Sequence, residues 1–203
     1  MPDKTSDLEA YALKINELQA RIRELEKILV TDELTQVLNR RGLEANLAMI
    51  AKEVNYQLKN PEKRRSTVIK ALSVVFIDID HFKVINDKYG HAGGDYILRE
   101  IAQVLRRQVR QLDIIGRYGG EEIVLGLIGA DRRDAERIAE QIRHHIENHE
   151  FVYEGQTIPV TASLGVVELE VGMSPHTMME LADQALYQAK NTGRNKVVVI
   201  DGS

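Results

Sequence analysis

The glycine pair Gly119–Gly120 separates two runs of β-type residues and constrains the fold more than any other feature of the chain. The runs are Asp113–Tyr118 and Ile123–Ile128. Because glycine accepts the positive φ that a two-residue turn requires, the sequence predicts an antiparallel hairpin here. Glu121 and Glu122 follow the turn directly. Neighbouring strand residues point to opposite faces, so we expect the two carboxylates to have different roles.

Acidic residues also follow a second predicted strand, which lies upstream: Asp78 and Asp80 come after the apolar run Leu72–Ile77. We call these two acidic strand ends, at Asp78 and at Glu121, the acidic tips. A continuous apolar run of this length is typical of a central strand buried on both faces. Carboxylates at the end of such a strand are costly unless water, a cation or a metal compensates them. If this strand lies beside the hairpin, the carboxylates of both tips form an oxygen-rich cluster suited to Mg²⁺. Solvated loop acids are the alternative that the residues alone leave open.

Composition narrows the class of protein. The chain has 203 residues, of which 43% are hydrophobic, which is enough for one domain with a sizeable core. It has no cysteine, so disulfides and thiolate metal sites are excluded. A net charge of −4 argues against a nucleic-acid partner. No apolar run reaches membrane-spanning length and no signal peptide begins the chain, so we expect a cytoplasmic protein with no membrane segment.

The first thirty residues differ in kind from the rest. Their apolar residues alternate spacings of three and four, which is the a/d seam of a coiled coil. A spacing of 3.5 favours a two-stranded coil over a helix packed on its own domain, which is the alternative. We therefore expect residues 1–30 to form a dimerisation helix and residues 31–203 to form the globular domain. The seam consists of Leu8, Tyr11, Ile15, Leu18, Ile22, Leu25 and Leu29.

Periodicity and breakers in the globular part predict a mixed α/β (α+β) fold, with a central, mostly antiparallel sheet flanked by helices. We expect helices at residues 41–58, 93–110, 132–148 and 175–191. Besides the hairpin, we expect strands at residues 72–77, 157–168 and 196–200.

Several separate motifs resemble those of the GGDEF domain family, in the same order and spacing over residues 31–200. The family's usual Phe after the acidic pair is Ile123 here, a smaller residue that can still pack in the hairpin. The matching segments are Asp32–Thr35, Phe76–Lys83, Ile85–Asp87, Gly90–His91, Gly94–Asp95, Arg117–Glu122, Ala185–Lys190 and Gly193–Asn195.

The resemblance implies a palm-like nucleotidyl-cyclase fold and a diguanylate cyclase, which condenses two GTP into cyclic di-GMP and releases pyrophosphate. It implies a homodimer, held through the coil, with one GTP in each protomer. A catalytically weak cyclic di-GMP receptor and a signalling scaffold are the alternatives.

Joining two nucleotides requires a 3′-hydroxyl to attack an α-phosphate, and metal ions commonly stabilise the charge that develops. The resemblance implies that Asp78, the backbone carbonyl of Ile79 and Glu121 hold Mg²⁺, with Mn²⁺ as a possible substitute. It also makes Glu121 the candidate base. Glu122 and Asp80 have either a direct role or a supporting one.

Phosphate oxygens need several donors. His81, Phe82 and Lys83 follow the first acidic tip, where free backbone N–H groups can hold phosphate. Lys190 and Arg194 match the family's triphosphate contacts. An ordinary helix C-terminus is the alternative for these two residues, because a cation in the last turn and a glycine after it are expected there.

We expect Asn86 and Asp95 to recognise the base of the nucleotide. Guanine presents N1–H and N2–H₂ donors with an O6 acceptor, which a carboxylate and an amide complement. Adenine places a lone pair where guanine has the N1 proton, so Asp95 argues for GTP. Asp95 can also serve as a helix N-cap after Gly93–Gly94, and the two roles are compatible.

Arg110 and Asp113 match the family's inhibitory RxxD site for cyclic di-GMP. They precede the strand that leads to the hairpin, so they are expected at the end of the strand away from the acidic tip. A surface salt bridge between them is the alternative.

Overall fold

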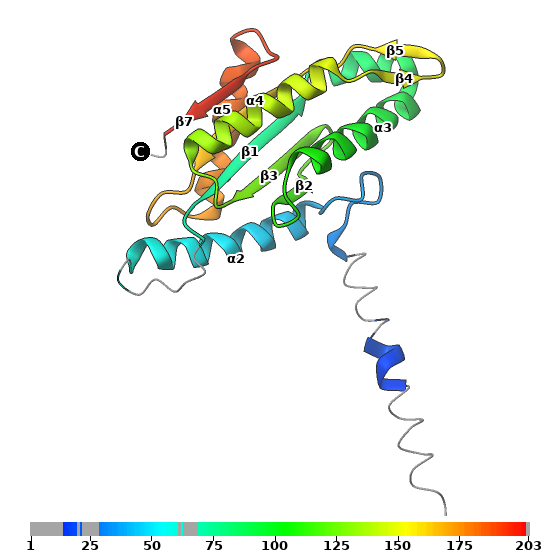
Figure 1. Ribbon diagram of the computed structural model, residues 1–203. Coiled ribbons are helices and arrows are strands. Elements are labelled where there is room, and N and C mark those ends of the chain that lie inside the picture. The colour runs from blue at the N-terminus through cyan, green and yellow to red at the C-terminus, as the bar shows by residue number, and fades with distance from the viewer. Residues whose placement is uncertain (1–13, 20, 22–28, 61, 63–68, 202–203) are drawn as a thin grey trace, which may run out of the picture.

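The computed structural model describes residues 14–19, 21, 29–60, 62 and 69–201 (Figure 1). Within this part of the chain, β2-β3-β1-β6-β7 is the order of a five-stranded sheet, and β4 and β5 form a separate pair. In chain order the elements are α2 (Arg40–Lys59), β1 (Leu72–Ile79), α3 (Phe82–Gln108), β2 (Ile114–Arg117), β3 (Glu122–Ile128), α4 (Arg132–Asn148), β4 (Phe151–Tyr153), β5 (Gln156–Ile158), β6 (Ala162–Glu168), α5 (Pro175–Asn191) and β7 (Val197–Ile200).

The central strand is β1, and all eight of its residues are buried. It pairs antiparallel with β3 on one side and with β6 on the other, and β7 adds to β6 in parallel. β2 and β3 form the predicted antiparallel hairpin, but its connection is longer than two residues and neither Gly119 nor Gly120 has a positive φ, so the expected turn type was wrong. The mostly antiparallel sheet flanked by helices is therefore confirmed.

Alternation along β1 divides the core into two layers. Val75, Ile77 and Ile79 belong to the apolar cluster that includes residues of α3 and α4. Val74 and Phe76 belong to the cluster that includes residues of α2 and α5. Figure 1 shows the sheet between these pairs of helices. Because strand side chains alternate, even-numbered residues at the end of β1 face the side of α5.

A short segment before α2 covers the outer edge of β2. The Leu38 N–H donates to the Ile115 carbonyl over 3.0 Å, and the Arg117 N–H donates to the Leu38 carbonyl over 2.7 Å. Thr31 and Leu38 form an antiparallel bridge within the segment, which closes it as a loop. The Asn39 side chain then caps α2 by accepting from the Gly42 N–H.

The helix expected at residues 93–110 is the second part of α3. α3 begins at Phe82 and is divided at Gly90, which has the non-helical angles φ 72° and ψ 170°. The part before the break was not predicted, and the part after it already includes Gly93 and Gly94, although glycine is a weak helix former. Asp95 is therefore not an N-cap.

The strand expected at residues 157–168 is two strands, β5 and β6, and β4 was not predicted. Pro159 follows β5 and lacks the N–H that a continuing ladder needs. Glu154 and Gly155, with φ of 49° and 76°, form the turn between β4 and β5.

The N-terminal coiled coil stays a prediction. Residues 14–19 are helical, and Ile15 and Leu18 are 55% and 51% exposed, as partner-facing residues would be in an isolated chain. The other seam residues before position 29 lie outside the described residues: Leu8, Tyr11, Ile22 and Leu25. No helix in the described ranges is long and apolar enough to cross a membrane.

Gly165 in β6 is a sensitive point of the fold, because a Cβ there would collide with the backbone of α5 at the Ala182 carbonyl and the Leu186 nitrogen. We expect Gly165→Ala to lower the free energy of unfolding by about 1–3 kcal/mol, because backbone cannot yield as a flexible side chain can. Urea denaturation measures this. Gly120→Ala, whose Cβ would have open space, is the control, and equal loss in both variants would contradict the packing argument.

Candidate active site

The two acidic tips meet at one end of the sheet. Asp78 in β1 is the register partner of Glu122 in β3. The hairpin turn is closed by the Tyr118 N–H, which donates to the Glu122 carbonyl over 2.9 Å. The convergence of the Asp78 tip and the hairpin is thus present in the structure, as the sequence predicted.

The two hairpin carboxylates open into separate cavities. Glu121 lines a cavity of about 410 Å³ together with Asn86 and Asp95. Glu122 lines a cavity of about 500 Å³ together with Lys190 and residues of α5. The two carboxylates thus have different surroundings, and only Glu121 lies beside the residues expected to recognise the nucleotide base. Their different roles stay a prediction.

The Asp78 carboxylate is buried against Lys190. Its side chain is 6% exposed, and its Oδ2 lies 2.6 Å from the Lys190 Nζ. Burial raises the pKa of Asp78 to about 6, and the nearby charges of Glu121 and Glu122 add to the rise, although Lys190 opposes it. One lysine therefore does not neutralise this cluster.

The surroundings of Glu122 include an acid that the sequence analysis did not single out. Burial raises the pKa of Glu122, the negative charge of Asp183 in α5 adds to the rise, and Lys190 opposes it. Asp183 lies two turns before Lys190 on the same helix, within the segment just ahead of the Ala185–Lys190 motif. The spacing of two helical turns, which places Asp183 on the same face of the helix as Lys190, is the sequence signal that could have identified Asp183.

The donor set fits a hard divalent cation. Within the described residues, no group of three or more His, Asp or Glu side chains is arranged as a metal site. Two carboxylates, Asp78 and Glu121, with the carbonyl of Ile79 offer oxygen donors only, which suits such ions. Burial and the neighbouring carboxylates raise the pKa of Asp78, so a bound cation would stabilise its charged form.

The cavity of Glu121 is formed around the break in α3. Asn86 precedes the break at Gly90 and Asp95 follows it, and both line the cavity. A Cβ at Gly94 would collide with the Asn86 amide oxygen, so glycine is needed for Asn86 to lie there. His91 also lines this cavity.

The turn from β1 into α3 presents free donors. His81 has the left-handed φ of 57° and makes no side-chain cap. Among the described residues, the backbone N–H groups of Phe82 and Lys83 have no hydrogen-bond partner. The side chain of Lys83 lines the cavity of Glu121. These positive groups next to Asp78 fit an anionic ligand.

Lys190 and Arg194 end α5 and the turn after it. The helix carbonyls there are satisfied by other residues: the Thr192 hydroxyl donates to the Gln188 carbonyl over 2.8 Å, and the Lys196 ammonium donates to the Thr192 carbonyl. Lys190 is instead directed at Asp78. The capping alternative therefore does not describe Lys190.

Arg117 braces the hairpin turn from behind. Its Nε and Nη2 donate to the Gly120 carbonyl over 3.1 and 2.8 Å. Its Nη1 lies 3.2 Å from the Asp32 carboxylate. Although burial acts against it, hydrogen bonds from Thr35 and the charge of Arg117 hold the pKa of Asp32 below its ordinary value. The ion pair joins residues 85 positions apart, so no local pattern announces it.

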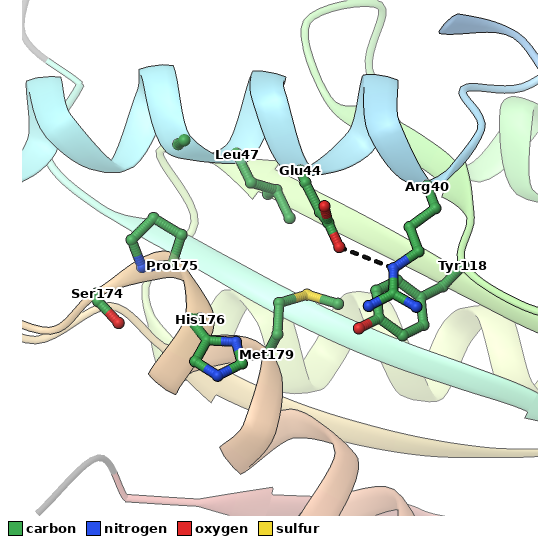
Figure 2. Close-up of a pocket in the computed structure, with 9 residues that line it drawn as sticks. Arg40, Glu44, Leu47, Tyr118, Ser174, Pro175, His176 and Met179 are labelled. Carbon is green, nitrogen blue, oxygen red and sulfur yellow. Dashed lines mark hydrogen bonds and ion pairs between the residues drawn. The ribbon is translucent and has the colours of Figure 1, made fainter.

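A third cavity of about 370 Å³ lies between α2 and α5 (Figure 2). Arg40 is paired with Glu44 at 2.9 Å and lies over the Tyr118 ring, with its guanidinium carbon 4.2 Å from the ring centre. Phe76 meets the same ring edge-on. Tyr118 immediately precedes the glycine turn, so these contacts fix the base of the hairpin.

Asp113 precedes β2, at the end of that strand away from the turn. Its carboxylate accepts from the Ile128 N–H over 2.9 Å and from the Arg110 N–H over 2.8 Å. The Arg110 side chain makes no ion pair within the described residues, and the residue is exposed. The surface salt bridge considered as an alternative is not the arrangement of this structure.

Comparison with known proteins agrees with these features. The family model described as "Diguanylate cyclase, GGDEF domain" matches residues 29–196. Diguanylate cyclase A of Treponema denticola is 39% identical over 145 residues, which are 71% of this chain but only 38% of that protein. The chain therefore spans well under half the length of this curated relative.

Solved structures agree over most of the chain. The crystal structure of the coiled coil and GGDEF domain of DgcB from Caulobacter crescentus, in complex with c-di-GMP, matches with a TM-score of 0.85 at 26% identity. The match covers 97% of this chain and 98% of that one. The active GGEEF domain of a diguanylate cyclase from Vibrio cholerae matches with a TM-score of 0.71 at 33% identity, over 81% and 97% of the two chains.

Asp78 is expected to make stability depend on pH. Its pKa of about 6 in the folded protein exceeds the ordinary 3.8, so between these values the folded state binds more protons and unfolding becomes easier as the pH rises. Without metal, we expect Asp78→Asn to be more stable than the wild type by about 1–2 kcal/mol at about pH 7.5, after allowance for solvent screening. The difference should disappear below about pH 4.

Urea denaturation with a chelator across this pH range measures the effect. Glu136→Gln, at an exposed position of α4, is the matched control and should show no such trend. A less stable Asp78→Asn at about pH 7.5 would mean that the ion pair with Lys190 outweighs the cost of burial.

Proposed function

The chain belongs to the GGDEF family of diguanylate cyclase domains, and on this premise we propose that it condenses two GTP into cyclic di-GMP with release of pyrophosphate. The observation that carries the proposal is the convergence of Asp78 and Glu121 beside a cavity lined by Asn86 and Asp95. A receptor for the product alone would have no need of a buried acid, paired with Lys190, next to two further carboxylates. We assign this activity to residues 31–203.

The chain's own residues would hold the nucleotide from base to triphosphate. Asn86 and Asp95 complement the hydrogen-bonding edge of guanine, and their shared cavity supports this role. The backbone N–H groups following His81 would donate to phosphate oxygens. Lys190 and Arg194 would hold the outer phosphates, which places the α-phosphate near the acidic tip.

Asp78, Glu121 and the carbonyl of Ile79 would hold a divalent cation, Mg²⁺ in preference and Mn²⁺ as a substitute. Such a cation supplies positive charge where phosphoryl oxygens gain negative charge. Glu121 accepts the proton of the attacking 3′-hydroxyl as the new P–O bond forms and the bond to pyrophosphate breaks. Glu122, in the neighbouring cavity, supports the site through its charge.

Two copies of the domain are needed to close the ring. One nucleotide in each copy gives two attacking hydroxyls and two leaving pyrophosphates, so two sites must face each other. We propose that residues 1–30 hold the copies together as a coiled coil, which raises the effective concentration of the second site. The coiled coil in the related DgcB structure supports this role.

We propose that cyclic di-GMP also binds at Arg110 and Asp113 and inhibits its own synthesis. The exposed Arg110 guanidinium is available to a phosphate or a guanine edge, and the bound cyclic di-GMP of the related DgcB structure supports the ligand. Asp113 lies at the opposite end of β2 from the hairpin, so inhibition would act through the arrangement of the protomers.

Glu121→Gln tests the proposed reaction. The change keeps the size of the side chain but removes its charge and basicity, so we expect cyclic di-GMP formation from GTP and Mg²⁺ to fall by at least about 100-fold. GTP affinity should change less, because the lost interactions matter most in the transition state. Product chromatography and calorimetry measure the two effects. Glu136→Gln is the control, and near-native turnover of Glu121→Gln would refute the assignment.

Asp95→Ser tests the choice of base. Hydrogen bonds to a charged group contribute about 1.5–3 kcal/mol, so we expect the preference for GTP over ATP to fall by about 10- to 100-fold. Asp95 lies within α3, so loss of a helix cap should not obscure the result. Turnover of each nucleotide by both proteins is the measurement. An unchanged ratio, with unchanged stability, would remove Asp95 from base recognition.

A further inference from the structure

The turn after α5 has an unusual backbone. Gly193, Arg194 and Asn195 have consecutive positive φ angles of 118°, 59° and 45°. For residues other than glycine this conformation costs about 1–3 kcal/mol each, and it persists only where surrounding groups impose it. The groups that hold this turn therefore determine where the Arg194 side chain lies.

The first group that fixes the turn is the Asp80 carboxylate, which lies directly after β1. The Asn195 N–H donates to its Oδ2 over 3.0 Å. The Thr161 hydroxyl donates to the same oxygen over 2.8 Å, and the Ser163 hydroxyl donates to Oδ1 over 2.7 Å. Asp80 is 4% exposed, so both oxygens are committed to these donors and do not reach a ligand.

The turn is also fixed by α4, whose side chains form hydrogen bonds with the Asn195 side chain. Its Nδ2 donates to the Glu147 carboxylate over 2.6 Å, and its Oδ1 accepts from the Arg143 guanidinium over 3.0 Å. The Arg143 side chain is only 17% exposed and also pairs with Glu140 and Glu147. The turn is therefore anchored to both the end of the central strand and a packed helix.

Arg194 itself is left free by this arrangement. Its N–H donates to the Ala189 carbonyl over 3.0 Å. Its side chain is exposed and has no hydrogen bond or ion pair with any residue that the structure describes. A free guanidinium on a turn that is held this firmly is suited to a ligand, because little conformational freedom is lost when it binds.

The end of β1 thus positions two cationic side chains, Lys190 and Arg194. Asp78 holds Lys190, and Asp80, two residues later on the same face, holds the turn that carries Arg194. We propose that Asp80 is a positioning residue for the substrate's triphosphate, which it acts on through Asn195 and Arg194. This inference rests on the proposed function of Arg194 as a triphosphate contact.

The test compares binding of 3′-deoxy-GTP and 3′-deoxy-GMP, which lack the attacking hydroxyl and so do not turn over. We expect Asp80→Ala to weaken the triphosphate about tenfold, the scale of one charge-assisted hydrogen bond, and to leave the monophosphate within about twofold. In a protein that already carries Arg194→Ala, Asp80→Ala should weaken triphosphate binding by less than about a further twofold, because its effect passes through Arg194.

Ser73→Ala is the matched control. Ser73 is buried at the other end of β1 and donates to the Ala130 carbonyl over 3.0 Å, so its loss weakens the same strand away from the site. We expect this variant to bind both nucleotides as the wild type does. If Asp80→Ala does not fold, Asp80→Asn replaces it, because the amide keeps the size of the side chain but offers one acceptor oxygen where the carboxylate offers two.

Four results would overturn the proposal. Equally weakened binding of both nucleotides would show a general loss of structure. If the losses of affinity of the two single variants multiplied in the double variant, Asp80 would not act through Arg194. An unchanged triphosphate affinity in the Asp80 variant, with Arg194→Ala weakened, would overturn the positioning role alone. An unchanged affinity in Arg194→Ala would overturn it together with the triphosphate contact assigned above.

Discussion

The buried carboxylate of Asp78 at the end of the central strand is the constraint around which the site is built. A charge in this place is tolerated because Lys190 reaches it from α5 and because the strand ends there. Burial and the hairpin acids still raise its pKa to about 6. A cation held by oxygen donors at this point would stabilise the charged carboxylate and so offset the cost of its burial.

The alternation of β1 explains why the parts of the site come from distant segments. Residues of one parity build the layer under α3 and α4, and residues of the other parity face α2 and α5. Glu121 and Glu122 repeat the same division at the hairpin and open into separate cavities. Lys190, the proposed contact of the outer phosphates, and the residues proposed for the nucleotide base thus line separate cavities, at Glu122 and at Glu121.

The sequence predicted the parts of the fold that depend on local pattern. The apolar run of β1, the two-glycine hairpin and the helices near residues 132 and 175 carry strong periodic or turn signals. The part of α3 before the break at Gly90 was missed, and the division of the last long strand at Pro159 was missed although proline is a local breaker of strands. Likewise, the pairs Asp32–Arg117 and Asp80–Asn195 join distant segments and have no periodic signature.

The segment that covers β2 has a consequence for how copies of this domain meet. A bare outer strand offers unpaired N–H and C=O groups, which invite another chain to extend the sheet. Leu38 occupies these groups at Ile115 and Arg117. Growth of the sheet through this side is therefore blocked by the chain itself. Two copies brought close together are thus kept from a β-sheet association here, which protects the hairpin from being drawn into an aggregate.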